Sequence, residues 1–239
     1  MRRAGIVLAA AAALSAGHAV AAEPWWSAFA DSTLDQLMHG AAPADTAGEQ
    51  ALVETYIVAR VDHARALLAS RLLQAAREEE ALLMDEPPGE TRNAALADVA
   101  RRLETFEGTA GAIASERSAV TADLARRSGI APDKLTGLLQ PSQAHQLLPR
   151  VDAPPPPGPG DERRQRVAAQ AEDFERHSAL LQARRLEMQA HEARQRAGKG
   201  DPLQALETYQ QLVLESDGLA LAGGRLALAW AQWLPAARK

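Results

Sequence analysis

Apolar residues recur at every third or fourth position over long stretches of this chain, and this spacing predicts α-helices. In residues 49–83 one helical face collects Ile57, Val61, Ala64, Leu68, Leu72 and Ala75. Pro87 and Pro88 cannot continue that helix, so the chain is expected to reverse there, with Asn93 as N-cap of a second helix. The second helix has a stripe at heptad spacing, consisting of Leu103, Phe106, Ala110, Ile113, Arg117, Val120 and Leu124. Gly129 is the residue expected to end it.

The last predicted helix begins at Pro202, after an N-cap at Asp201, and runs towards Leu234. It carries two neighbouring stripes. The first consists of Leu206, Tyr209, Val213, Ser216, Ala220, Gly223, Ala227, Trp230 and Leu234. The second consists of Ala205, Leu212, Leu219, Ala222, Leu226, Ala229 and Trp233. Two stripes about 100° apart predict a helix that packs between two others, as in a bundle or a wall of helices.

A proline-rich segment divides the chain. Residues 150–161 contain "APPPPGPG", which favours an extended linker that buries little surface. The expected organisation is a signal peptide at 1–22, an N-terminal helical half at 23–149, this linker, and a C-terminal helical half at 162–239. The N-terminal half is expected to hold a helical hairpin. The C-terminal half begins with a charged helix over residues 162–197.

Composition supports an all-α fold. The chain has 239 residues, of which 46% are hydrophobic and only 4% are aromatic. Alanine, leucine, glutamate, glutamine and arginine dominate, and these residues favour helices over strands. We therefore expect long antiparallel helices in a coiled-coil-like bundle.

The first 22 residues have the features of a secretory signal. Arg2 and Arg3 precede an apolar run, and small residues follow at the expected cleavage site. No other stretch has the roughly 20 apolar residues that a membrane-spanning helix needs. The chain contains no cysteine, which excludes disulfides and thiolate chemistry, and its formal net charge of -5 argues against nucleic acid as a partner. The expected location is the periplasm.

No residue pattern predicts catalysis or a bound cofactor. The sequence lacks a Gly-rich phosphate loop, a Gly-x-Ser-x-Gly elbow and a His-Glu-x-x-His helix. His177 and His191 are expected on one helix face but about 21 Å apart, too far to share a metal ion. His39 and His63 could meet only through tertiary contact. The acidic cluster consists of Glu78, Glu79, Glu80, Asp85 and Glu86, and we interpret it as a solvated face near a helix end. We therefore expect a protein that is not an enzyme and has no resident metal.

Two adjacent tryptophans open the predicted mature chain, in "WWSAFADSTLDQL". Trp25 and Trp26 are expected to dock this N-terminal segment on the helices that follow. The alternative is a contact surface for a partner. The segment resembles the start of TolC-like outer-membrane efflux factors, in which a Trp-Trp-x-x-Phe-x-Asp-x-x-Leu pattern precedes the first long helix. The matching residues are Trp25, Trp26, Phe29, Asp31 and Leu34.

Further blocks are similar to the same family. "ARVDHARALLASRLLQA" resembles its first helix, and the segment from Gly200 to Leu234 resembles its closing helix. Members of that family have two similar halves, each with two membrane strands, and three chains close a barrel. A membrane strand needs about 9–11 residues of alternating polarity, and none is visible in this sequence. We therefore expect no transmembrane β-barrel.

The resemblance implies a periplasmic helical protein that serves as an accessory or assembly component of an efflux or transport complex. Two alternatives stay open at this point: a small periplasmic metal-binding protein, and a decayed fragment of an efflux factor. The expected partner is an efflux component or a second copy of the chain. The residues expected in packing or interaction are Trp25, Trp26, Phe29, Leu212, Leu219, Leu226, Trp230 and Trp233. Because the charged helix has few large apolar residues, a partner is expected to cover the strip of Leu212, Leu219, Leu226 and Trp233.

Overall fold

Every regular element in the described part of the chain is a helix. The computed structural model describes residues 24–139, 148–150 and 161–237, and none of these residues forms a strand. The elements are the 3-10 helix η1 (Trp25–Phe29) and the α-helices α1 (Ser32–Ala41), α2 (Thr46–Asp85), α3 (Glu90–Ser128), α4 (Pro132–Leu138), α5 (Glu162–Arg196) and α6 (Pro202–Ala237). The predicted signal peptide and linker residues 151–160 lie outside the described residues. The expected all-α fold of long packed helices is confirmed.

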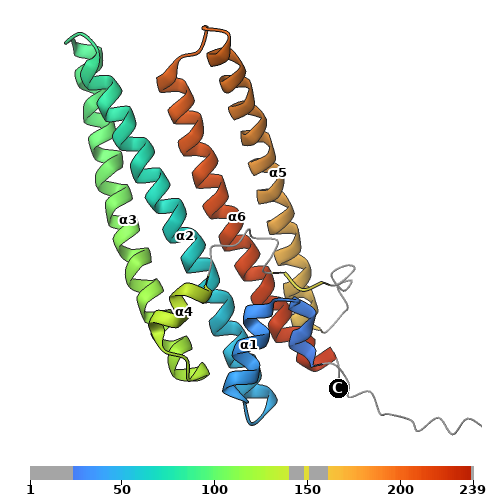
Figure 1. The fold of residues 1–239 in the computed structure, drawn as a ribbon. Coiled ribbons are helices and arrows are strands. Elements are labelled where there is room, and N and C mark those ends of the chain that lie inside the picture. The colour runs from blue at the N-terminus through green and yellow to red at the C-terminus, as the bar shows by residue number, and fades with distance from the viewer. Residues whose placement is uncertain (1–23, 140–147, 151–160, 238–239) are drawn as a thin grey trace, which may run out of the picture.

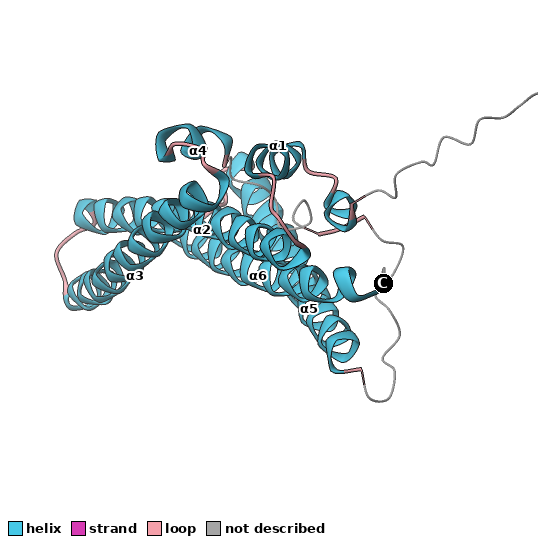
Figure 2. Ribbon diagram, turned by 90° about the horizontal axis from the view of Figure 1, so that it is seen from below, coloured by secondary structure: helices cyan, strands magenta, loops and turns pink. Residues whose placement is uncertain are grey.

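Four long helices lie side by side in the order α3, α2, α6, α5 (Figures 1 and 2). The α2–α3 hairpin and the α5–α6 hairpin meet along α2 and α6. The short helices η1, α1 and α4 gather at one end, which we call the base, opposite the two hairpin turns (Figure 1). In the described residues, α3 and α5 share no extended interface. The fold is thus a layer of two hairpins that rest on a common base.

Most of the large buried side chains lie in one cluster at the base. It joins η1 and α1 to the N-terminal part of α2 and to the ends of α3, α5 and α6 that lie beside it. Its largest members include Trp25, Trp26, Phe29, Leu34, Leu37, Tyr56, Ile57, Leu124, Leu135, Leu226, Trp230 and Leu234. The base therefore supplies much of the apolar burial that holds both hairpins.

Helix ends follow local capping chemistry. The Asp201 carboxylate accepts a hydrogen bond from the backbone N–H of Leu203 at 2.9 Å, so this predicted N-cap is confirmed. Gly129 ends α3 with a φ of 69°, as its sequence position predicts. The expected N-cap at Asn93 is wrong, because α3 already begins at Glu90. The extended residue Gly89 follows the prolines directly, and its carbonyl accepts the first helical bond, from the Asn93 N–H at 3.0 Å.

Helix α6 packs between α2 and α5, as its two apolar stripes predict. Small residues make the contact with α2 close. An ideal Cβ placed on Gly224 would lie only 2.6 Å from Val61 Cγ2 on α2. On the α5 side, the same construction at Gly218 meets His177 Nδ1 at 2.9 Å. Gly224 therefore sets the spacing between the two hairpins, and Gly218 sets the spacing between α5 and α6.

The contact at Gly224 gives a first prediction. A Gly224→Ala substitution adds a methyl group where Val61 leaves no room, so it should lower the free energy of unfolding by about 1–3 kcal/mol. Gly108→Ala is the matched control, because nothing lies within 4 Å of its added Cβ. That change should raise the free energy of unfolding by about 0.5–1 kcal/mol through helix propensity. Urea unfolding of both variants measures the difference, and equal effects would contradict the close α2–α6 contact.

Candidate interaction surface

The predicted N-terminal packing residues lie inside the base. Trp25, Trp26 and Phe29 are all buried on η1, which packs against α6. The Trp25 indole Nε1 donates a hydrogen bond to Glu49 Oε2 at 2.8 Å. The Trp26 ring meets the His39 ring edge-on, with centroids 5.8 Å apart. These side chains fasten the N-terminal segment to the helices and offer little surface to a partner.

A polar cluster fixes the same segment in place. Asp31 Oδ1 accepts from the backbone N–H of Thr33 at 2.9 Å and so caps α1. Its other oxygen accepts from the Tyr56 hydroxyl at 2.7 Å and from the Arg60 guanidinium at 3.3 Å. Burial raises the pKa of Tyr56 well above its usual value, so the hydroxyl stays a donor. The Asp31 carboxylate therefore fixes the positions of η1, α1 and α2 relative to one another.

The predicted residues of α6 also lie mainly at the base. Leu226 and Trp230 are buried, whereas Leu212, Leu219 and Trp233 are half-buried. The Trp230 and Trp233 rings pack edge-on with centroids 5.3 Å apart. The second stripe of α6 is therefore not a continuous exposed strip. Leu226 is covered within this chain, and only the other three residues are partly exposed to solvent.

An apolar groove lies elsewhere, between α2, α3 and α6. Both α3 and α6 contact α2 but diverge from each other, and the space between them holds a cavity of about 50 Å³. The apolar wall of this groove consists of Leu68, Ala69, Leu72, Phe106, Ile113, Val213 and Leu214. Leu214 is 43% exposed. We call this feature the α2–α3–α6 groove.

Charged side chains close the base end of this groove. The Arg65 guanidinium on α2 lies 3.1 Å from Asp217 on α6 and 3.8 Å from Glu116 on α3. One arginine therefore spans three helices. It leaves the pair of carboxylates with one uncompensated negative charge.

A second polar network closes the end nearer the hairpin turns. Arg102 on α3 donates to both carboxylate oxygens of Glu79 on α2, at 2.7 Å and 3.0 Å. Arg102 also donates to the Gln210 side-chain oxygen on α6 at 2.6 Å, and the Gln210 amide donates to Glu79 at 2.7 Å. Asp98 accepts from Arg102 at 3.1 Å. The network therefore joins α2, α3 and α6 through side-chain hydrogen bonds.

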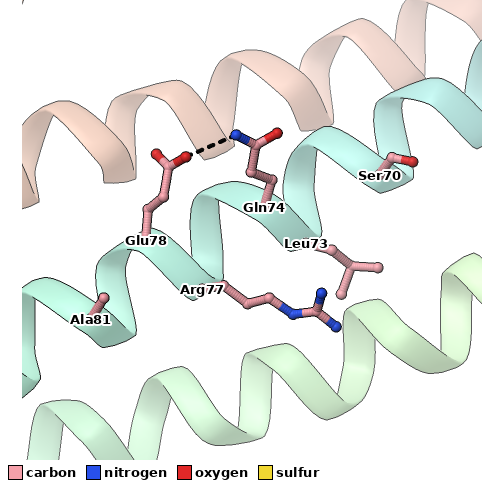
Figure 3. A pocket seen from close by; sticks show the side chains of 6 residues that line it. All are labelled: Ser70, Leu73, Gln74, Arg77, Glu78 and Ala81. Atoms are coloured by element: carbon pink, nitrogen blue, oxygen red, sulfur yellow. Dashed lines mark hydrogen bonds between the residues drawn. The ribbon is translucent and has the colours of Figure 1, made fainter.

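Residues of the predicted acidic cluster lie on different faces of α2. Glu79 turns inward to the network, whereas Glu78 points outward and accepts a hydrogen bond from Gln74 at 2.9 Å (Figure 3). The six residues around this outward face all belong to α2 and line a shallow hollow of about 430 Å³. Arg77 extends from it to Glu107 on α3 at 3.1 Å. This face is a solvated helix surface with no convergent chemistry.

The four histidines in the described part of the chain do not form a ligand set. His39 packs on Trp26, His63 lies buried on α2, and His177 faces Gly218 across the α5–α6 contact. His191 is buried on α5. Among the described residues, no three His, Cys, Asp or Glu side chains are grouped closely enough to hold a metal ion.

No protein-family description, curated protein or solved structure matches this chain.

The Glu79–Arg102–Gln210 network generates a second prediction. Arg102→Leu leaves the Glu79 carboxylate without its cation, so the free energy of unfolding should fall by about 1–3 kcal/mol. Arg101→Leu removes a neighbouring arginine whose ion pair with Asp98 is exposed, and it should change stability by less than about 0.5 kcal/mol. Chemical denaturation distinguishes the two variants. Equal losses would mean that the network does not join the three helices.

Proposed function

We propose that this chain is an accessory or assembly component of a transport complex and binds a helical segment of a partner protein. The α2–α3–α6 groove carries this proposal. Three helices surround an apolar floor there, and a fourth helix laid between α3 and α6 would cover Phe106 and Leu214. Binding of this kind needs no catalytic group, and we propose that the protein is not an enzyme.

The charge at the base end of the groove specifies the partner further. At the base end, one arginine faces the carboxylates of Glu116 and Asp217, which leaves a net negative charge. At the other end two arginines, Arg101 and Arg102, balance the two carboxylates. A matching partner helix would carry an apolar stripe with a basic residue at the position that faces the base end of the groove.

The setting of the proposal comes from the sequence. The signal-like start supports export to the periplasm, and the resemblance to TolC-like factors supports a transport complex. None of the helices in the described ranges combines the length and apolar content needed to cross a bilayer. A second copy of this chain is the other occupant that the groove would accept.

Site-specific photo-crosslinking in cells tests the proposal. A benzoylphenylalanine at Leu214 should form a covalent adduct with a transport component, through a partner helix of the stated charge pattern. Leu180 on α5 is a matched control, because it is 45% exposed but lies outside the groove. Adducts of equal yield at both positions, or none at Leu214, would contradict a groove-specific partner. An adduct with a second copy of the chain would instead show that the groove mediates self-assembly.

A functional variant complements the crosslink. Leu214→Glu places a charge on the rim of the groove without changing a buried position, so the chain should stay folded by circular dichroism. If the groove serves a transport complex, this variant should reduce tolerance to exported compounds as much as deletion of the gene does. Leu180→Glu should behave like the unaltered chain. Full activity of the Leu214→Glu protein would count against the proposal.

A further inference from the structure

A polar cleft lies between α2, α3 and α4, close to the base but outside the α2–α3–α6 groove. Gly129 turns the chain at the end of α3, and the fully buried Leu135 docks α4 back onto the helices. The space that remains has a volume of about 320 Å³. This volume is at the lower end of the range of small-molecule sites, roughly 300–1,000 Å³. We call it the α2–α3–α4 cleft.

Two opposite charges line this cleft without pairing. Arg117 comes from α3 and Asp133 from α4. Within the described residues, neither side chain has an ion pair or a hydrogen-bond partner. Most arginines of α3 behave differently: Arg101, Arg102, Arg126 and Arg127 all pair with a nearby carboxylate. A separated cation and anion that face one cleft can each receive a group of opposite charge from a ligand.

His63 adds an uncharged acceptor to the cleft wall. Its Nδ1 lies 2.8 Å from the Ala59 carbonyl oxygen and must donate to it, since a carbonyl only accepts. Burial lowers the pKa of His63, and the nearby positive charge of Arg117 acts in the same direction. The ring is therefore neutral near pH 7, and its Nε2 is an acceptor. The hydroxyls of Ser118, Thr121 and Thr136 complete the polar lining.

We infer that the α2–α3–α4 cleft binds a small zwitterion of the amino-acid type. The carboxylate of the ligand would pair with Arg117 and its ammonium group with Asp133. The balanced lining disfavours other classes: Asp133 repels a phosphate, and Arg117 repels a metal ion that His63 and Asp133 alone would hold poorly. This inference is independent of the groove and of the proposed function.

Calorimetry on the purified full chain tests the inference. The twenty common amino acids and dialanine are the first probes, and at least one should bind at millimolar concentration or below. The amide of the best binder lacks the carboxylate, and its N-acetyl derivative lacks the ammonium group. Each derivative should bind about tenfold more weakly or worse, because each loses one charge-assisted contact. Absence of binding by every probe, or equal binding of the two derivatives and the parent, would overturn the inference.

Two variants assign the charges. Arg117→Gln should weaken binding of the zwitterion about tenfold and remove its advantage over the amide. Asp133→Asn should also weaken binding of the zwitterion about tenfold, and it should remove the advantage of the zwitterion over the N-acetyl derivative. Arg101→Gln is the matched control on α3, outside the cleft, and should leave affinity unchanged. Circular dichroism verifies that all three remain folded, as expected for exposed positions. If Arg117→Gln and Arg101→Gln bind alike, the cleft is not the site.

Discussion

The close contact between α2 and α6 is the constraint on which this structure depends. Each hairpin is made of neighbouring segments, but α2 and α6 come from opposite sides of the proline-rich linker. Gly224 lets α6 approach Val61 so closely that no side chain fits between them. Arg65 and Glu79 add polar contacts to α6 farther along α2. Apolar packing thus sets the separation of the hairpins, and the polar contacts set their register.

The two proposed binding features follow from how α2 is surrounded. At the base, η1, α1 and α4 add to the long helices and cover almost every side of α2. Towards the hairpin turns only α3 and α6 remain, and their divergence opens the α2–α3–α6 groove. The α2–α3–α4 cleft lies where α4 folds back beside His63 and Arg117. One end of the layer is therefore closed mainly by apolar burial. The α2–α3–α4 cleft lies at the edge of this end, and the α2–α3–α6 groove lies farther along α2, towards the hairpin turns.

Periodicity in the sequence was sufficient to predict the long helices, the caps at Asp201 and Gly129, and the place of α6 between two neighbours. The short helices α1 and α4 were not assigned, because ten and seven residues carry too few repeats for a periodic signal. The groove also escaped prediction, since it depends on the angle between α3 and α6. Neither Glu79 among three successive glutamates nor Arg102 beside Arg101 differs from its neighbours in type. Only tertiary packing shows which of them turns inward.

A disulfide between α2 and α6 tests the central claim most directly. An ideal Cβ on Gly224 would lie 3.6 Å from Val61 Cβ, within the range of about 3.5–4.5 Å that disulfides require. The chain has no other cysteine, so a Val61→Cys/Gly224→Cys protein can form only this internal bond or a bond between molecules. Mild oxidation should give a cross-linked monomer, seen as a faster band in non-reducing electrophoresis that dithiothreitol reverses. A thiol pair that stays reduced, or that yields only dimers, would contradict the joined hairpins.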